Sequence, residues 1–196
     1  ELGIGFCFAP LFHGAMKYAA PVRKQLGIRT IFNLLGPLTN PARAEFQLLG
    51  TSSVAIANRL ARALVELGRS QAFVVCGADQ LDEVSLWGRT TAFEIRGAQL
   101  IEHHWTAESF GLAECDVGPL QVDSPVASAQ MVRQVFEGVA GPPRDIVVAN
   151  AAAGLLAARQ ADELPQAVTM AAAAIDSGRV ASLLQQLVAM TVAFRG

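Results

Sequence analysis

The sequence predicts an α/β fold with a mostly parallel sheet, an antiparallel addition and helices packed on the sheet. The continuous apolar run at residues 72–76 is typical of a strand that is covered on both faces in a parallel sheet. A short apolar run at 46–49 and the helical pattern at 54–67 form a strand–helix unit before it. Shorter extended patterns between residues 84 and 105 predict the antiparallel addition.

The helix of the strand–helix unit has recognisable ends. Ser53 is of a type that caps helix N-termini, and Gly68 is placed to stop the helix. Apolar residues spaced by three or four positions predict its buried stripe: Ala57, Leu60, Leu64 and Leu67.

Three extended pieces are expected in the antiparallel addition, at residues 84–87, 91–95 and 100–105. Gly88 and Gly97 lie between these pieces, so turns are expected there.

The last third of the chain is expected to be helical. Ser124 and Pro125 form a cap followed by proline at the first helical position. The apolar stripe of that helix is expected at Val126, Ala129, Val132 and Phe136. Asp145 is expected to cap the next, alanine-rich helix, and two more helices are expected at residues 164–178 and 179–190.

The first residues suggest a strand that already lies inside a sheet. Ile4, Phe6 and Phe8 alternate with small residues, and helical segments are expected between residues 13 and 26. The chain also begins without methionine. We therefore expect residues 1–196 to be a single region of a longer protein.

Composition excludes several classes of protein. Charged residues make up 16% of the 196 residues, against roughly 25% in typical domains, so we expect other protein surface to cover part of the molecule. The net charge of -2 and only two lysines argue against nucleic-acid binding. Three scattered cysteines without metal-ligand spacing fit a reducing cytoplasm. No apolar run reaches the ~18 residues that would span a membrane.

The segment at residues 23–41 predicts a binding site. Basic and amide residues lie there among apolar ones without amphipathic regularity, and Gly36-Pro37 and Asn40-Pro41 force the backbone to turn. Arg23 offers a planar fork of donors that can hold a carboxylate through two hydrogen bonds. This segment is therefore suited to a small anionic molecule.

An adjacent acidic pair, Asp82-Glu83, follows the apolar strand at 72–76. Ligands bind beyond the carboxyl ends of strands in open α/β sheets. Mg²⁺ takes one or two protein carboxylates and completes its octahedron with water and substrate phosphate oxygens, so this pair is a candidate magnesium site. His103 and His104 would point to opposite faces of a strand, and we treat both as surface residues.

Taken together, the segments at residues 8–13, 23–41 and 79–83 resemble the carboxyl-terminal part of the anthranilate phosphoribosyltransferases. The resemblance extends with gaps from about Gly5 to about Leu187. It implies a nucleoside phosphorylase/phosphoribosyltransferase-like architecture and transfer of phosphoribose from phosphoribosyl diphosphate to the amine of anthranilate, a step of tryptophan biosynthesis. It also implies Mg²⁺ as cofactor, a cytoplasmic location and a homodimer for the full-length enzyme.

The resemblance also implies roles for individual residues. Arg23 would anchor the anthranilate carboxylate, and Asp82 and Glu83 would bind Mg²⁺. The residues expected to hold the anthranilate ring are Ala9, Pro10, His13, Gly36 and Pro37. No covalent nucleophile is expected, because an aromatic amine can attack an activated sugar carbon directly. Glycine is usual in the family at the position of Gln80.

The amino-terminal helical region and the glycine-rich diphosphate loop of the family are not in this sequence, so we expect the chain alone to be inactive. One alternative is a pyrimidine nucleoside phosphorylase of the same fold, which would lack the pocket at residues 23–37. A second is a non-catalytic relative that binds nucleic acid or protein; the scarcity of lysine and the intact acidic pair argue against it.

Overall fold

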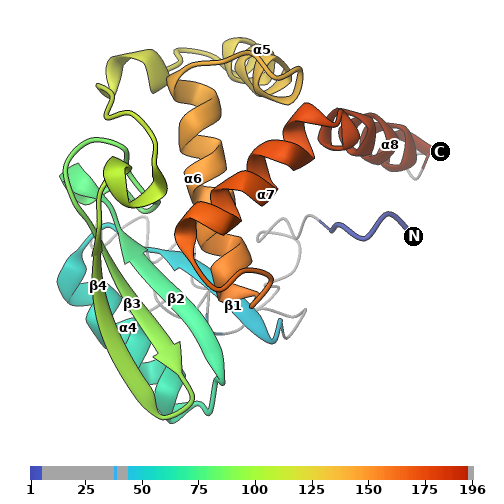
Figure 1. The fold of residues 1–196 in the computed structure, drawn as a ribbon. Helices are drawn as coiled ribbons and strands as arrows, with labels where there is room; N and C mark the ends of the chain where they lie inside the picture. The colour runs from blue at the N-terminus through green and yellow to red at the C-terminus, as the bar shows by residue number, and fades with distance from the viewer. Residues whose placement is uncertain (6–37, 39–43, 194–196) are drawn as a thin grey trace, which may run out of the picture. The chain divides into compact units, whose positions relative to one another are not determined.

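The computed structural model describes residues 1–5, 38 and 44–193 (Figure 1). The chain divides into two compact units, Glu1–Glu45 and Phe46–Gly196, and the description below concerns the second. In the first unit Ile4 and Gly5 are irregular, and the rest of the expected strand and the helical segments up to residue 26 lie outside the described residues.

The second unit contains a mixed four-stranded sheet in the order β1-β2-β3-β4 (Figure 1). The strands are β1 (Phe46–Gly50), β2 (Gln71–Cys76), β3 (Thr90–Arg96) and β4 (Gln99–Trp105). β1 runs parallel to β2, whereas β2 with β3 and β3 with β4 are antiparallel pairs. The α/β class and the antiparallel addition are therefore confirmed. Among the described strands one pairing of three is parallel, so this sheet is mixed and not mostly parallel as expected.

One expected strand is absent: residues 84–87 form irregular structure instead. Val84, Ser85 and Leu86 are nevertheless fully buried, with exposed fractions of 0%. Their apolar pattern reflected burial of a loop and not pairing in a sheet. Gly88 and Gly97 lie at turns as expected, both with positive φ.

Helix α4 (Val54–Glu66) packs on β2 and β3. Its buried residues are Ala57, Leu60, Ala61 and Leu64. Leu67 was wrongly assigned to the stripe, because it lies after the last helical turn and is 59% exposed. Ser53 does flank the helix, but its side chain makes no capping hydrogen bond.

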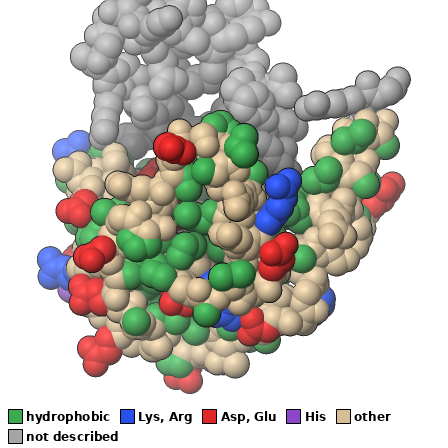
Figure 2. Space-filling view, turned by 90° about the horizontal axis from the view of Figure 1, so that it is seen from above, with side chains coloured by type: hydrophobic (Ala, Val, Ile, Leu, Met, Phe, Trp, Pro, Cys, Tyr) green, Lys and Arg blue, Asp and Glu red, His purple; other side chains and the backbone are tan. Residues whose placement is uncertain are grey.

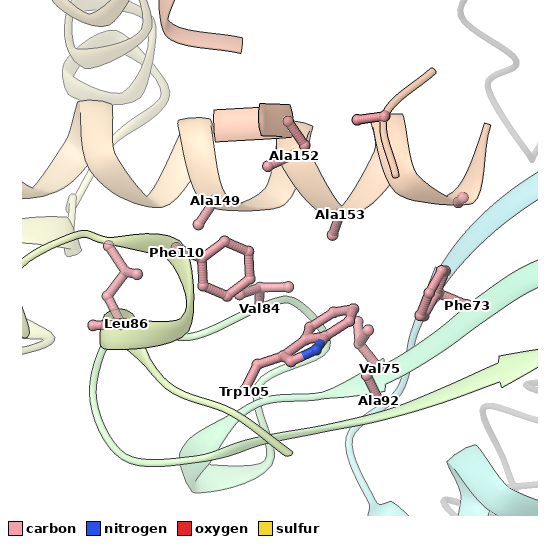
Figure 3. Packing of buried hydrophobic residues seen from close by; sticks show 14 residues of the cluster. Phe73, Val75, Val84, Leu86, Ala92, Trp105, Phe110, Ala149, Ala152 and Ala153 are labelled. Carbon is pink, nitrogen blue, oxygen red and sulfur yellow. The ribbon is translucent and has the colours of Figure 1, made fainter. Parts of the chain in front are cut away.

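Helix α6 (Pro142–Ala157) packs near the sheet through small side chains. Ala149, Ala152 and Ala153 are fully buried and face a cluster that includes Phe73 and Trp105 (Figure 3). Because successive side chains of a strand alternate between faces, Phe73 and Val75 of β2 lie on this side, while Ala72 and Val74 lie on the other. All six residues of β2 are buried, as the sequence predicted for a strand covered on both faces.

The other helices of the last third are α5 (Pro125–Phe136), α7 (Leu164–Asp176) and α8 (Arg179–Ala193). The Ser124 Oγ accepts a hydrogen bond from the Ala127 N–H at 3.2 Å, which confirms the predicted cap. Three short 3₁₀ helices complete the second unit: η1 (Ala78–Gln80), η2 (Ala107–Phe110) and η3 (Gly118–Leu120).

Two details of the predicted helices are wrong. Val126 and Val132 of α5 are 78% and 42% exposed, and the buried residue is Val135. Asp145 does not cap α6, because the helix begins three residues earlier, at Pro142, and Asp145 lies in its first turn.

Hydrophobic side chains gather in the middle of the face shown in Figure 2, with several acidic side chains around them. The exposed apolar residues include Val126, Val139 and Val147. No single helix among the described residues is long and apolar enough to span a membrane, although the bent pair α7 and α8 together passes that test by length and composition.

Candidate active site in the acidic loop after β2

The acidic loop, residues 77–85, begins directly after β2 and carries the exposed pair Asp82 and Glu83. It lies at the carboxyl ends of the two parallel strands, where open α/β sheets bind ligands. A Cβ atom on Gly50, the last residue of β1, would overlap the carbonyl oxygen of Asp82. The backbone of the acidic pair therefore rests directly on the end of β1, which only glycine permits.

Short hydrogen bonds fix the first half of the acidic loop. The Gly77 N–H donates to the Leu81 carbonyl at 2.8 Å, and the Leu81 N–H donates to the Ala78 carbonyl at 3.0 Å. The Ala78 N–H donates to the Ser85 Oγ at 2.9 Å. Ser85 is held in turn by β3, because its N–H donates to the Thr90 Oγ1 at 3.0 Å.

Asn150 of α6 holds the end of the loop. The Val84 N–H donates to the Asn150 Oδ1 at 2.8 Å, and the Asn150 Nδ2 donates to the Val84 carbonyl at 3.0 Å. The same Nδ2 donates to the Ile146 carbonyl, one turn earlier in α6, at 3.0 Å. One amide thus satisfies both backbone groups of Val84, the residue next to Glu83, and connects the acidic loop to the helix.

Two residues of η1 adopt the left-handed conformation that favours glycine. Asp79 has φ of 53° and Gln80 has φ of 63°. The Asp79 carboxylate is held by the Trp87 indole N–H, which donates to its Oδ2 at 3.0 Å. Non-glycine residues in this conformation store strain, which frequently occurs at functional sites. Gln80 therefore occupies a position that suits the glycine usual in the resembled family.

The negative charge of Asp82 acts on its neighbours in the loop. Burial, and then the negative charge of Asp82, raise the pKa of Glu83 above its usual value. Burial and Asp82 also raise the pKa of the Cys76 thiol at the end of β2. The acidic loop thus concentrates negative charge at the edge of the sheet, and a bound cation would relieve that repulsion.

The donors of the loop fit a magnesium ion and do not fit zinc. Within residues 1–5, 38 and 44–193 no group of three or more His, Cys, Asp or Glu side chains is arranged to hold a metal. A pair of exposed carboxylates meets the requirement of Mg²⁺, which keeps several waters and binds through substrate phosphates. Zinc would demand four tetrahedral ligands, chiefly nitrogen and sulfur.

Comparison with known proteins identifies the family. The family model described as "Glycosyl transferase family, a/b domain" matches residues 1–181. This chain belongs to that glycosyl transferase family. A curated relative, the anthranilate phosphoribosyltransferase of Geobacter sulfurreducens, is 46% identical over 191 residues, which are 97% of this chain and 55% of the relative. The enzyme of the same name from Chromobacterium violaceum is 42% identical over 191 residues, 97% of this chain and 56% of the relative.

Solved structures of the glycosyl transferase family give the same result. The anthranilate phosphoribosyltransferase of Thermus thermophilus matches with a TM-score of 0.89 and 39% identity, over 96% of this chain and 56% of that chain. The enzyme of Saccharomyces cerevisiae in complex with PRPP and Mg matches with a TM-score of 0.78 and 28% identity, over 88% of this chain and 50% of that chain. The resemblance to these enzymes is therefore confirmed, and the chain spans about half their length.

The predicted site residues divide into two groups. Asp82 and Glu83 lie where the sequence placed them, at the end of β2, and their role as magnesium ligands stays a prediction. The predicted anthranilate pocket lies outside the described residues: Ala9, Pro10, His13, Arg23, Gly36 and Pro37. His103 is not a plain surface residue, because it is half-buried and its Nε2 lies 2.9 Å from the Glu94 Oε2.

Sequence reasoning missed the residues that position the acidic loop. The helix that contains Asn150 was expected only to be rich in alanine, which is correct. The role of Asn150 could have been inferred from its position among alanines that face the core, because a buried amide side chain needs hydrogen-bond partners. Gly50 gave no comparable signal, because its contact depends on how the loop returns to β1.

Proposed function

We propose that this chain takes part in the transfer of phosphoribose from phosphoribosyl diphosphate to the amine of anthranilate, with release of diphosphate. The observation that supports this most strongly is an exposed Asp-Glu pair, held rigidly at the carboxyl ends of β1 and β2, in a chain similar to a yeast enzyme that was solved with PRPP and Mg. The proposal concerns the whole enzyme, because the relatives are about twice as long as the matched region.

Asp82 and Glu83 would hold the magnesium ion in this proposal. When bound, Mg²⁺ supplies positive charge that stabilises the diphosphate as it leaves. The protein's own contribution is rigidity: Gly50 lets the loop rest on β1, and Asn150 fixes its end to α6. Preorganised charge is effective in catalysis because no reorganisation is needed when the reaction occurs.

Positioning of anthranilate would fall to the segment predicted from sequence. Arg23 would bind the anthranilate carboxylate, and the ring would be held by Ala9, Pro10, His13, Gly36 and Pro37. The amine would then face the anomeric carbon without a covalent intermediate, and correct placement of the two reactants supplies much of the rate.

Four further parts of the proposal rest on the family resemblance. The enzyme would act in tryptophan biosynthesis, in the cytoplasm and as a homodimer. The whole of residues 1–196 would form one region, the carboxyl-terminal part of the catalytic domain. The exposed valines of α5 and α6 provide apolar surface that a larger enzyme or a second subunit could cover.

The test follows the loss of anthranilate fluorescence in the whole enzyme with phosphoribosyl diphosphate and Mg²⁺. We expect turnover that requires all three components, and an Arg23→Ala variant with the KM for anthranilate raised by ten-fold or more, since a charge-assisted hydrogen bond contributes roughly 1.5–3 kcal/mol. Phosphorolysis of a pyrimidine nucleoside without turnover of anthranilate would overturn the proposal, and an unchanged KM would remove Arg23 from the pocket.

A further inference from the structure

A pocket lies along the face of the sheet that carries Phe73, from Gln71 at the start of β2 to Trp105 at the end of β4. Its volume is about 580 Å³, and it is lined by Gln71, the first residue of β2, by β3 and β4, and by the segment that joins α6 to α7. The acidic loop follows Cys76, the last residue of the same strand. This volume falls in the range of small-molecule sites, and nothing in the proposed transferase reaction uses it.

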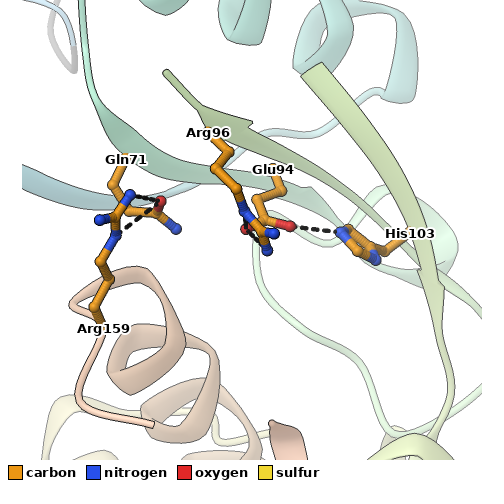
Figure 4. Close-up of polar contacts among 5 residues, drawn as sticks. All are labelled: Gln71, Glu94, Arg96, His103 and Arg159. Atoms are coloured by element: carbon orange, nitrogen blue, oxygen red, sulfur yellow. Dashed lines mark hydrogen bonds and ion pairs between the residues drawn. The ribbon is translucent and has the colours of Figure 1, made fainter. Parts of the chain in front are cut away.

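One polar cluster in the pocket is already satisfied. Glu94 of β3 has a side chain only 5% exposed, and the Arg96 Nη2 and the His103 Nε2 lie 2.7 Å and 2.9 Å from its two carboxylate oxygens (Figure 4). Burial by itself would raise the pKa of Glu94, but these hydrogen bonds outweigh it and lower the pKa. Glu94 is therefore ionised and compensated by its neighbours, and it has no need of a ligand.

The other polar pair in the pocket is incomplete. Gln71 is only 3% exposed, and its Oε1 accepts hydrogen bonds from the Arg159 Nε at 3.3 Å and Nη2 at 3.1 Å (Figure 4). Its amide nitrogen has no hydrogen-bond partner within the described part of the chain, and Arg159 has no carboxylate partner there either. The backbone of Arg159 has a φ of 54°, in the left-handed region that disfavours any residue with a Cβ.

The floor and the far rim of the pocket supply the remaining groups. Phe73 and Trp105 line it as a pair of tilted rings with centroids 5.3 Å apart. Asp162 and Glu163, at the start of α7, bring two carboxylates that form no ion pair within residues 44–193. Once the Glu94 cluster is set aside, the lining offers an amide N–H and a guanidinium for an anion, carboxylates for a cation, and an apolar surface.

We propose that this pocket binds a zwitterionic amino acid with an apolar side chain. Its carboxylate is recognised by Arg159 and the free amide N–H of Gln71, its ammonium group by Asp162 and Glu163, and its side chain by the aromatic floor. A simple carboxylate would leave the two rim acids unmatched, and a simple amine would leave Arg159 and the Gln71 amide unmatched. Charge complementarity of this kind selects a zwitterion over either.

The test uses tryptophan fluorescence, because Trp105 lines the pocket and the chain has only two tryptophans. In a Trp87→Phe background of residues 1–196, Trp105 is the only tryptophan left in that chain. We expect L-phenylalanine to change its emission saturably, with a Kd on the order of 1 mM for a ligand of this size. The analogues 3-phenylpropionate and 2-phenylethylamine each lack one charged group, and each should bind about ten-fold more weakly.

Variants separate this pocket from any other binding site. Arg159→Asn removes the guanidinium but keeps a residue that tolerates positive φ, and it should weaken L-phenylalanine binding about ten-fold. Arg133→Gln, on α5 and away from the pocket, should leave the Kd unchanged. The proposal is overturned if Arg159→Asn binds normally, if either analogue binds as tightly as the amino acid, or if neither fluorescence nor saturation-transfer NMR detects binding. A thermal melt checks that each variant is folded.

Discussion

Asn150 gives the clearest prediction about the acidic loop. Truncation to alanine removes three hydrogen bonds, two of them to the backbone of Val84, which has an exposed fraction of 0%. A buried backbone group that loses its partner costs about 1–3 kcal/mol. Since the N–H and the C=O of Val84 both lose their partner, we expect Asn150→Ala to lower the free energy of unfolding by about 2–5 kcal/mol.

Urea unfolding measures this change, with Asn58→Ala as the matched control. Asn58 accepts a single hydrogen bond from the Arg62 Nε on the surface of α4, so its loss should change stability by no more than about 0.5 kcal/mol. The magnesium concentration for half-maximal activity of the whole enzyme should rise in Asn150→Ala and stay constant in the control. A loss of stability below about 1 kcal/mol would show that the amide does not hold the loop, and the reasoning about its position would be wrong.

Three other substitutions test the geometry and charge of the loop. Gly50→Ala should destabilise the fold by about 1–3 kcal/mol, because the new Cβ meets the Asp82 carbonyl. Gly154→Ala, which adds a Cβ in open space within α6, should stabilise the fold by up to about 1 kcal/mol. Effects of the same sign in urea unfolding would contradict this reasoning. Gln80→Gly should stabilise the fold by about 0.5–1 kcal/mol, because φ at this position is positive, and a lower urea midpoint would refute the strain. The pKa of Glu83 is raised in the folded state, so its ionised form disfavours folding. Glu83→Gln should therefore have a higher Tm than the parent at pH 7, and this difference in Tm should disappear below the ordinary pKa of 4.5. A difference in Tm that persists in acid would exclude the charge of Glu83 as its cause.

The fold could be predicted largely because its core elements carry strong patterns. Five of the six buried residues of β2, Ala72 to Cys76, form an uninterrupted apolar run, and the stripe of α4 repeats at helical spacing. Residues 84–87 were mistaken for a strand because a buried loop shows the same apolar pattern. Only its hydrogen bonds, to an amide 66 residues away in the sequence, distinguish it, and no local pattern contains that information.

The candidate site could be predicted in part. The acidic pair follows a recognisable buried strand, so its place at the sheet edge followed from the order of elements. The residues that hold the pair in place could not be found, because Gly50, Thr90 and Asn150 belong to three different elements that only folding brings together. The anthranilate pocket was assigned from resemblance alone, and its residues stay a prediction.

The magnesium activation profile of the whole enzyme tests the central claim most directly. The measurement is the initial rate of anthranilate consumption over a series of Mg²⁺ concentrations, for the parent and for the double variant Asp82→Asn, Glu83→Gln. We expect the parent to depend on the ion and the variant, which keeps the size of both side chains, to lose that activation. Normal magnesium activation in the double variant would contradict the assignment of the acidic loop as the metal site.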